Sequence, residues 1–302
     1  MERVPVGGTD LEVTTLTFGS APLASVFWGN DERTAVATVQ AARDEGIRLF
    51  DTAPFYGLGE AEERVGVGLS GAEVGDALVA TKVGRTVTGS GPEREVVFDY
   101  SPDGVRRQLD ASRQRLGRDR LDIVHVHDPE EHLDEAIGSC LPTLSALRAA
   151  GEIGAVSVGT NHCSTVLRFL DDGDPDLVML AGRLTLLDRS ALVEVVPACA
   201  RRGVPLFAAG VFNSGVLADP SPGRWFDYAP ADEAVLARAR TMQRICAEAG
   251  VPLRAVAMAF PLRFEPVATV VVGMSGPGEV TENLALMELE IPDDLWAELG
   301  VE

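Results

Sequence analysis

The sequence has few basic residues for the number of acidic ones. It contains 26 Lys and Arg residues against 46 Asp and Glu, which gives a formal net charge of −20. A field of this sign repels phosphate backbones and anionic lipid, so it argues against a nucleic acid or a membrane surface as the partner. The phosphates of a bound cofactor can still be held locally by backbone N–H groups at helix N-termini.

Long apolar runs and cysteine motifs are also absent from the sequence. No uninterrupted apolar run approaches the roughly 18 residues that a membrane span needs, and the segment MERVPVGGTDLEV lacks the apolar core of a signal peptide. The four cysteines (Cys140, Cys163, Cys199 and Cys246) form no CxxC motif and no repeated spacing, which is typical of reduced, buried thiols. We therefore expect a cytoplasmic protein without disulfides.

Short apolar runs alternate with longer amphipathic stretches along nearly the whole chain. The runs are Leu16–Phe18, Ile47–Phe50, Ala77–Ala80, Leu121–Val126, Ala155–Val158, Leu177–Leu180, Pro205–Ala208 and Ala268–Val272. Eight strand–helix alternations, with strands apolar on both faces, predict a parallel sheet covered by helices. Eight such units in about 300 residues fit a closed (β/α)8 TIM barrel. An open doubly wound α/β sheet is the alternative.

Two segments stand outside this alternation. Arg3–Val13 is typical of a β-hairpin, with Gly7 and Gly8 at its turn, placed before the first barrel strand. Thr86–Tyr100 is too long for an ordinary connection between a strand and its helix, so we expect a long polar loop there. With no low-complexity linker, repeat or composition boundary, residues 1–302 are predicted to form a single barrel domain with extra helices.

Polar side chains follow three of the predicted strands at the point where each strand ends. Asp51 and Tyr56 follow the second strand, Lys82 follows the third and His127 ends the fourth. In a barrel these ends meet at one rim, where the active sites of such barrels lie. A free tyrosine, with a pKa of about 10, is a poor acid or base at neutral pH, but a nearby ammonium favours its phenolate form. The four residues together predict a proton-transfer site.

The sequence resembles the aldo-keto reductases. The segments that carry the resemblance are LFDTAPFYGLGEAEERVGVGL, VATKVG, LDIVHVHDPEE, GAVSVGTNH and VVVGMSGPGEVTENL, in the family's order. With the predicted hairpin they span almost the whole chain. A narrower resemblance, carried by HDPEE and AGRLTLLDRSALVEVVPACARRGVP, is to the bacterial sugar 1-dehydrogenase branch, which includes L-fucose and D-threo-aldose dehydrogenases, and to pyridoxal 4-dehydrogenases.

The resemblance implies a catalytic tetrad of Asp51, Tyr56, Lys82 and His127. Tyr56 would be the proton relay, Lys82 would tune it, Asp51 would anchor Lys82, and His127 would orient the substrate oxygen. His127 is preferred over His125 because the family's histidine stands five residues after the acid that leads the strand. Residues two apart point to the same side of a strand, so His125 is expected one layer deeper in the barrel.

The resemblance also implies a nicotinamide dinucleotide that is bound across the rim without a Rossmann domain. The implied cofactor-binding positions are Gly19, Asp51, Thr160, Asn161, Asn213, Ser214, Gly215, Gly273, Glu279, Glu282 and Asn283.

The same segments predict NAD rather than NADP as the cofactor. In members that prefer NADP, a lysine and an arginine after the last strand grip the 2′-phosphate, and Gly273 and Glu279 occupy those places here. Losing a buried charge partner should weaken NADP binding by about 2–5 kcal/mol. A carboxylate can instead accept hydrogen bonds from free ribose hydroxyls. Glu279 also lies near a predicted helix N-terminus, where it is suited to capping, and the two roles are compatible.

Some positions depart from the family's pattern. Ala209 stands where many members stack an aromatic ring on the nicotinamide, and the usual glutamine after the sixth strand is missing. Arg183, in that region, is either a ligand contact or a salt-bridged surface arginine. Trp28 is a candidate for the substrate pocket, together with Tyr56 and His127.

Two short motifs imitate other kinds of site. Gly66–Gly71 is a literal GxGxxG, but it follows a charged helix instead of a strand, so it lacks the context of a phosphate-binding loop. His125 and His127 imitate a metal-binding pair, but His132 and His162 are the only other histidines. We therefore expect no metal.

These observations predict an oxidoreductase that transfers a hydride between NAD and a small-molecule carbonyl/alcohol pair. The most specific form of the prediction is oxidation of an aldose at C1 to the lactone. One alternative is an NADPH-dependent carbonyl or aldehyde reductase, and another is a nucleotide-binding redox sensor without significant turnover. The protein is expected to be a monomer or a small homo-oligomer.

Overall fold

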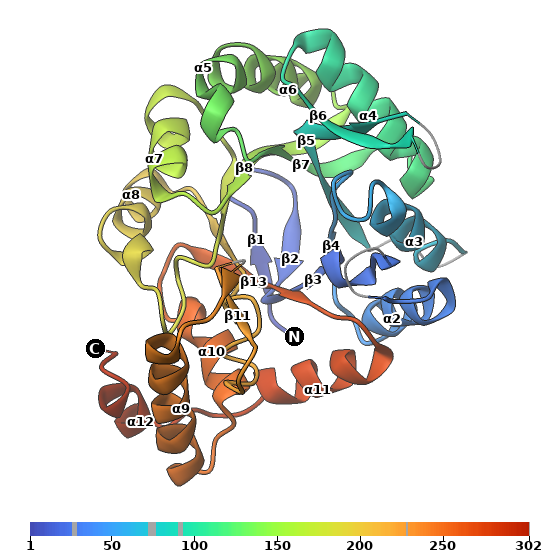
Figure 1. Cartoon of the computed structure of the whole chain (residues 1–302). Coiled ribbons are helices and arrows are strands. Elements are labelled where there is room, and N and C mark those ends of the chain that lie inside the picture. The colour runs from blue at the N-terminus through green and yellow to red at the C-terminus, as the bar shows by residue number, and fades with distance from the viewer. Residues whose placement is uncertain (26–28, 72–76, 90–92, 228, 302) are drawn as a thin grey trace.

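The computed structural model of the chain describes residues 1–25, 29–71, 77–89, 93–227 and 229–301. Within these residues eight parallel strands close into a barrel (Figure 1). The barrel strands are β3 (Leu16–Gly19), β4 (Leu49–Asp51), β5 (Leu78–Thr88), β7 (Leu121–His127), β8 (Ile153–Thr160), β9 (Leu177–Ala181), β10 (Leu206–Ala209) and β13 (Val267–Gly273). They neighbour one another in the order β4-β3-β13-β10-β9-β8-β7-β5, and a β4–β5 pairing closes the ring. The predicted TIM barrel is confirmed, and the open sheet is wrong.

Helices surround the strands on the outside of the barrel (Figure 1). The helices that follow the eight strands in turn are α2 (Glu32–Asp44), α3 (Glu60–Gly68), α4 (Pro102–Leu116), α6 (Leu141–Ala149), α7 (Cys163–Asp172), α8 (Val195–Arg202), α10 (Leu253–Leu262) and α11 (Pro277–Met287). The additional helices are α5 (Leu133–Glu135), α9 (Glu233–Glu248) and α12 (Asp293–Glu298), with short helical turns at Ala21–Leu23, Glu130–His132, Ala136–Cys140 and Ser190–Leu192. A two-stranded ribbon of β11 (Trp225–Phe226) and β12 (Ala229–Pro230) precedes α9.

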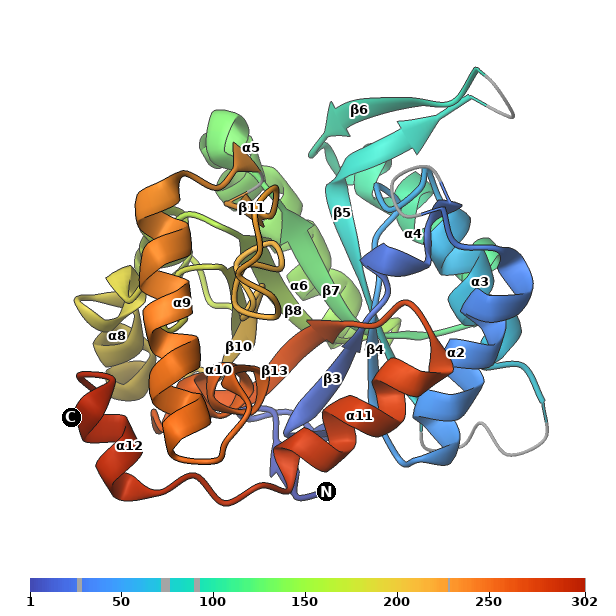
Figure 2. The same ribbon diagram turned by 60° about the horizontal axis from the view of Figure 1, so that its bottom comes forward.

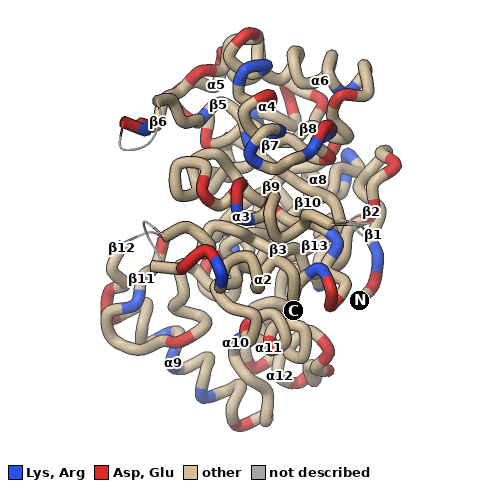
Figure 3. Tube along the Cα trace, turned by 90° about the vertical axis from the view of Figure 1, so that its right-hand side faces the viewer, with Lys and Arg blue, Asp and Glu red and all other residues tan. Residues whose placement is uncertain are grey.

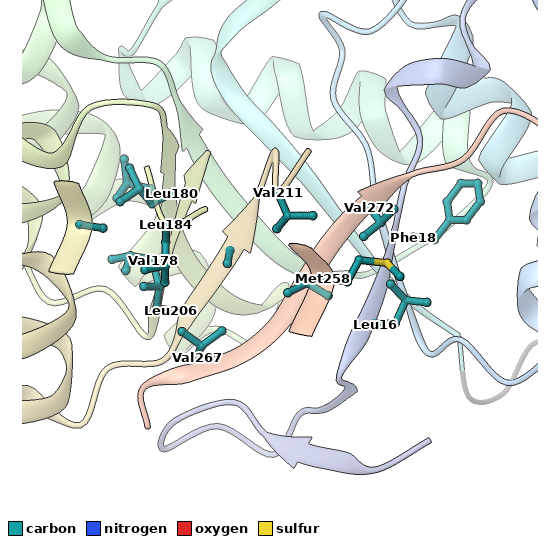
Figure 4. Close-up of a cluster of buried hydrophobic side chains, with 14 of the residues drawn as sticks. Leu16, Phe18, Val178, Leu180, Leu184, Leu206, Val211, Met258, Val267 and Val272 are labelled. Atoms are coloured by element: carbon teal, nitrogen blue, oxygen red, sulfur yellow. The ribbon is translucent and has the colours of Figure 1, made fainter. Parts of the chain in front are cut away.

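The hydrophobic core lies mainly between the strands and the helices. Leu16, Phe18 and Val272 on the sheet and Met258 on α10 are buried in this layer (Figure 4). It forms because the strands carry apolar residues on both faces, so their outer face needs a cover of amphipathic helices. The layer holds each strand end in a fixed position at the rim.

A β-hairpin closes the N-terminal end of the barrel. β1 (Arg3–Pro5) pairs antiparallel with β2 (Glu12–Thr14), as the sequence predicts. Val6 and Val13 are fully buried against a smaller apolar cluster inside the barrel, which includes Phe207. The hairpin therefore shuts this end, and the opposite end carries the polar residues.

The described part of residues 86–100 does not form the long loop that the sequence predicts. β5 continues to Thr88 and pairs antiparallel with β6 (Glu95–Asp99), so a β-hairpin rises beyond the rim (Figure 2). Its strands are rich in β-branched residues, which favour extended structure over an open loop. At its base Gly84 has a φ of +96°, and a Cβ there would lie 1.9 Å from Cε1 of Tyr100.

The GxGxxG sequence serves helix packing in this structure. Gly66 lies within α3, and a Cβ at this position would lie 2.6 Å from the carbonyl oxygen of Arg115 on α4. Gly68 is similarly close to Val39 of α2. The glycines allow α2, α3 and α4 to approach one another closely. This agrees with the prediction that the motif is not a phosphate-binding loop.

Charged residues are spread over the outer elements, with acidic and basic side chains interspersed (Figure 3). No single helix in the described part of the chain is long and apolar enough to cross a membrane. Only α9 and α10 taken together have that length and composition, and they meet at a bend of 98°. Cys140, Cys199 and Cys246 are buried free thiols, as expected, whereas Cys163 is half-buried.

Candidate active site

The centre of the site is a buried ion pair between neighbouring strands. Lys82 is the only lysine of the chain, and its Nζ donates hydrogen bonds to both carboxylate oxygens of Asp51 and to the Thr52 carbonyl, each at 2.8 Å. The two charged side chains are only 2% and 4% exposed. Burial raises the pKa of the Asp51 carboxyl, and the Lys82 ammonium opposes that rise. All three ammonium hydrogens therefore have acceptors inside the protein.

Tyr56 and His127 lie beside this pair. Nζ of Lys82 is 4.9 Å from the centroid of the Tyr56 ring, and the rings of Tyr56 and His127 are 6.2 Å apart at an interplanar angle of 90°. Burial lowers the pKa of His127 well below its usual range, with further lowering by nearby cations. A neutral imidazole offers one donor and one acceptor. The structure thus brings the four predicted residues together.

His125 lies one layer deeper in the barrel, as the strand alternation predicts. It is paired in register with Lys82 on β5, and its side chain is fully buried. Its Nε2 is 3.6 Å from Oδ1 of Asp51, which is too long for a hydrogen bond. Burial, with a smaller effect from Lys82, lowers the pKa of His125 well below its usual range. An uncharged imidazole therefore backs the ion pair.

Two glycines end neighbouring strands at the same rim. Gly19 of β3 is paired in register with Gly273 of β13. A Cβ on Gly273 would lie 2.8 Å from Cγ of Pro22, and a Cβ on Gly19 would lie 3.1 Å from the carbonyl oxygen of Val272. Side chains are therefore excluded at both positions, and Gly273 is exposed at the rim whereas Gly19 is buried beneath it.

The rim holds buried polar atoms that lack partners. The hydroxyls of Ser20 and Thr52 and the Nδ1 of His127 have no hydrogen-bond partner among the described residues. Buried polar groups are normally hydrogen-bonded, so such a cluster fits a site that receives a polar ligand. A nicotinamide dinucleotide, with amide, hydroxyl and phosphate groups, has the required chemistry.

Thr160 ends β8 and Asn161 follows it, and both lie near Glu130. The Thr160 hydroxyl donates a hydrogen bond to the Glu130 carboxylate, and so does the Thr165 hydroxyl, at 3.3 Å. The Asn161 carbonyl accepts a hydrogen bond of 2.8 Å from Nε of Arg183. Glu130, which the sequence reasoning did not select although it lies in the HDPEE segment, therefore orients the Thr160 side chain.

Arg183 holds several loops of the rim together. Besides Asn161, its guanidinium contacts Asp188 at 3.1 Å and Asp227 at 2.9 Å. The arginine is thus salt-bridged, the second of the two roles considered from the sequence. It ties the loop after β9 to the segment that precedes α9.

The predicted pyrophosphate segment forms a turn after β10. Asn213, Ser214 and Gly215 have φ values of +45°, +58° and +104°. The Asn213 side chain is buried, accepts a hydrogen bond of 2.5 Å from the Thr185 hydroxyl and donates one of 3.1 Å to the Gly182 carbonyl. This amide therefore shapes the turn.

Glu279, in the first turn of α11, turns its side chain back onto Ser275, the residue before the N-cap residue Gly276. Its carboxylate accepts hydrogen bonds from the backbone N–H of Ser275 at 2.8 Å and from the Ser275 hydroxyl at 3.0 Å. These bonds hold the segment that leads into α11 and place the carboxylate beside the helix N-terminus, but the carboxylate does not cap an N–H of the first turn. Asn30, from the loop after β3, donates a hydrogen bond of 2.7 Å to the Ser275 carbonyl and fixes the same turn.

Glu282 and Asn283 share an arginine that the sequence reasoning missed. Arg254 of α10 contacts Oε1 of Glu282 and Oδ1 of Asn283, each at 2.7 Å. Asn283 is buried, whereas Glu282 is exposed. Because 28 residues or more separate the partners along the chain, no local pattern in the sequence indicates this contact.

A second missed pair lies next to His127. Arg85 and Asp128 form an ion pair of 2.8 Å, and the Arg85 guanidinium lies 3.6 Å from the centroid of the Phe55 ring. Asp128 belongs to the HDPEE segment, so that motif was the sequence signal that could have identified it.

The remaining predicted residue, Trp28, lies outside the described residues. No group of three or more His, Cys, Asp or Glu side chains in the described part of the chain is placed to hold a metal ion.

Comparisons with known proteins agree with this geometry. A sequence profile of the aldo/keto reductase family matches residues 15–300. D-threo-aldose 1-dehydrogenase from Pseudomonas sp. is 38% identical, with 96% of this chain and 94% of that protein aligned. Pyridoxal 4-dehydrogenase from Microbacterium luteolum is also 38% identical, over 100% of this chain and 97% of the relative. L-galactose dehydrogenase from Arabidopsis thaliana is 33% identical, over 96% and 89%.

Solved structures show the same fold. An aldo-keto reductase from Bacillus halodurans in its holo form superposes with a TM-score of 0.83 at 24% identity, covering 99% of this chain and 95% of that one. A glycerol dehydrogenase from Gluconobacter oxydans gives a TM-score of 0.79 at 24% identity, covering 99% and 94%. The family match along almost the whole chain, together with the barrel and its rim residues, shows that this chain belongs to the aldo/keto reductase family, oxidoreductases that act on CH–OH and carbonyl groups with nicotinamide cofactors.

Proposed function

We propose that the protein oxidises an aldose at C1 to the lactone, with NAD as the hydride acceptor and Tyr56 as the proton relay. The observation that carries the proposal is the buried Lys82–Asp51 pair, with its ammonium 4.9 Å from the Tyr56 ring. Two relatives whose names denote sugar dehydrogenases support the aldose. The single domain, the cytoplasmic location and the monomeric or small homo-oligomeric state stay predictions.

The side chains divide the proton chemistry among them. The Lys82 ammonium stabilises Tyr56 as the phenolate, and the phenolate Oη accepts the proton of the C1 hydroxyl as the C1 hydride leaves, which converts Tyr56 to the neutral phenol. Asp51 holds the ammonium in place. The His127 imidazole, which is neutral, donates a hydrogen bond to the reacting oxygen. The bound nicotinamide supplies the hydride-accepting ring carbon.

The proposed cofactor-binding residues lie at strand ends, in the turn after β10 and in α11. Gly19, Gly273, Thr160 and Asn161 would line the nicotinamide half at the rim, and the turn at residues 213–215 would lie beside the pyrophosphate. Glu279, Glu282 and Asn283 would line the adenosine half. Glu279 supports NAD over NADP, because its carboxylate repels a 2′-phosphate.

One observation favours NADPH-dependent carbonyl reduction as a second candidate. Arg254 places a cation beside Glu282 and Asn283, and a cation there could attract a 2′-phosphate. Its contact of 2.7 Å with Glu282 already balances that charge. We therefore retain NAD as the first proposal.

An equilibrium titration with NADH and with NADPH, followed by protein fluorescence, tests the cofactor. The wild type is expected to bind NADH more tightly than NADPH. Glu279→Gln should reduce the difference between the two affinities, because it removes the carboxylate charge that repels the 2′-phosphate of NADPH. Tighter binding of NADPH by the wild type would contradict the preference for NAD and favour the reductase.

The same preparation then tests the proton relay. Tyr56→Phe should lower kcat for aldose oxidation by about 100- to 10,000-fold, the usual contribution of a positioned acid or base, while NADH binding is retained. Aldose and aldehyde turnover that survive this change would show that Tyr56 is not the relay. Binding of neither nucleotide would contradict the proposed function as a whole.

A further inference from the structure

The Arg85 guanidinium is held in a defined plane next to the catalytic side chains. Its Cζ lies 3.6 Å from the centroid of the Phe55 ring, and its Nη1 donates a hydrogen bond of 2.8 Å to Oδ2 of Asp128. The side chains of Arg85 and Asp128 are 27% and 33% exposed, so a ligand can reach both. Stacking and ion pairing together leave the arginine little freedom to reorient.

The aspartate of this pair adjoins His127. Oδ2 of Asp128 is 3.6 Å from Nε2 of His127. The backbone that carries both residues is fixed from two sides, because Tyr100 Oη donates a hydrogen bond of 2.8 Å to the His127 carbonyl and Asp128 N–H donates one of 3.0 Å to Gly159. Asp128 itself has a φ of +42°. A substrate oxygen held by His127 would therefore have the carboxylate of Asp128 as its neighbour.

The arginine keeps unused hydrogen-bonding capacity. Its Nε is buried and has no hydrogen-bond partner in the described part of the chain. A ligand cannot reach this Nε, but Nη2 of the partly exposed guanidinium donates no hydrogen bond among the described residues and can donate to a ligand oxygen. The Asp128 carboxylate likewise has acceptor sites beyond the one that Arg85 uses.

We propose that Arg85 and Asp128 bind the adjacent hydroxyl groups on C2 and C3, the two carbons that follow the reacting C1 of an aldose. This inference rests on the proposed function. Each hydroxyl both donates and accepts a hydrogen bond, so adjacent hydroxyls match a carboxylate beside a guanidinium. A phosphorylated or carboxylated substrate fits less well, because Asp128 already neutralises Arg85 and the net charge of the chain is −20. An unsubstituted aldehyde would leave Nη2 of Arg85 without an acceptor from the substrate.

Kinetics with paired substrates test the inference. We compare three values of kcat/KM: for oxidation of an aldopentose, for oxidation of its 2-deoxy counterpart and for reduction of pentanal. Each is measured in the wild type, in Arg85→Met and in Asp128→Asn. Methionine keeps an unbranched stem against Phe55, and asparagine tolerates the positive φ of residue 128. Each variant should reduce the ratio of the aldopentose value to the pentanal value by about tenfold or more, the effect of one or two lost hydrogen bonds. The wild type should prefer the aldopentose to the 2-deoxy sugar, and the variants should lose that preference.

A matched control removes an exposed Arg–Asp pair elsewhere. Arg168 contacts Asp172 at 2.7 Å on α7, and Arg168→Met should leave the substrate ratio at the wild-type value. Calorimetric binding of the aldopentose to the nucleotide-loaded protein gives a second readout that needs no turnover, and Arg85→Met should weaken it by a similar factor.

The outcomes separate the inference from the proposed function. An equal decrease in kcat/KM for the aldopentose and for pentanal in the Arg85→Met variant would overturn the inference, since Arg85 would then act through His127 or through the fold. Pentanal reduction without any binding of the aldopentose would also overturn it, while leaving an oxidoreductase. If no substrate is turned over, the proposed function fails, and calorimetry alone decides whether the pair binds the sugar.

Discussion

The Lys82 ammonium reaches Tyr56 through its charge and not through a hydrogen bond. Its three hydrogens are already donated to Asp51 and to the Thr52 carbonyl, so the phenol is influenced across 4.9 Å. This arrangement makes the position of the charge depend on Asp51. Lys82 is the only lysine among the 26 Lys and Arg residues of the chain, and its compact ammonium differs in geometry from the planar guanidinium of an arginine.

Breaking the buried pair should cost more stability than replacing both of its members. Lys82→Met leaves the Asp51 carboxylate buried without its cation, which should lower the free energy of unfolding by about 3–5 kcal/mol. The double variant Asp51→Asn/Lys82→Met removes that charge and should recover part of the loss. Both proteins should remain at least about 100-fold less active, because neither places an ammonium beside Tyr56. Urea unfolding and kcat for aldose oxidation check this, and a double variant less stable than Lys82→Met would contradict it.

The hairpin of β5 and β6 links a backbone feature to the site. Gly84 starts the bend with a φ of +96°, and the ring of Tyr100 fills the space where a Cβ would stand. The same Tyr100 hydroxyl holds the backbone of His127. A change at Gly84 is therefore expected to reach His127, the proposed catalytic histidine, through one intervening side chain.

Gly84→Ala should destabilise the protein more than a comparable change elsewhere. The positive φ alone costs about 1–2 kcal/mol for a residue with a Cβ, and the overlap with Tyr100 should add about 1–3 kcal/mol. Gly46→Ala is the matched control, because Gly46 has a φ of +84° with no atom within 4 Å of a built Cβ. Urea unfolding measures both variants. Equal losses would show that Tyr100 yields without cost.

The buried histidines make the stability of the whole molecule depend on pH. Burial lowers the pKa of His125 and of His127 well below 6.5 in the folded state. The unfolded chain takes up protons as the pH falls through about 6.5. Because the unfolded state then binds more protons, these histidines lower the free energy of unfolding as the pH decreases from 7 to 5.

Removing one of these histidines should flatten that dependence. His125→Leu eliminates one titrating group, so its decline between pH 6.5 and pH 5 should be shallower by up to about 1.4 kcal/mol per pH unit. The sign follows from the lowered pKa: the contribution of His125 vanishes above pH 7 and becomes unfavourable below 6.5. Urea unfolding at pH 7, 6 and 5 gives the slopes. Parallel slopes for the two proteins would contradict this prediction, because they would mean that His125 takes up its proton as readily in the folded state as in the unfolded state.

The elements with strong local signals could be predicted from the sequence. The eight strands are apolar on both faces, so each appears as a short apolar run, and the N-terminal hairpin carries its turn glycines. The β5–β6 hairpin was missed because a polar, glycine-containing segment resembles a loop until its partner strand is known. The contacts of Arg254 and Arg85 were missed for a related reason, since their partners are distant in sequence.

The order of the residues along the chain by itself determined the barrel and the set of four residues at its rim. Parallel strands bring their carboxyl ends to one side, so Asp51, Lys82 and His127 had to meet wherever the barrel closed. Only the tertiary structure decided that the Lys82 ammonium donates its hydrogen bonds to Asp51 and to the Thr52 carbonyl. It also decided that the Arg85 guanidinium lies between the Phe55 ring and the Asp128 carboxylate. Those outcomes depend on side-chain directions and on burial, which arise when distant segments pack together.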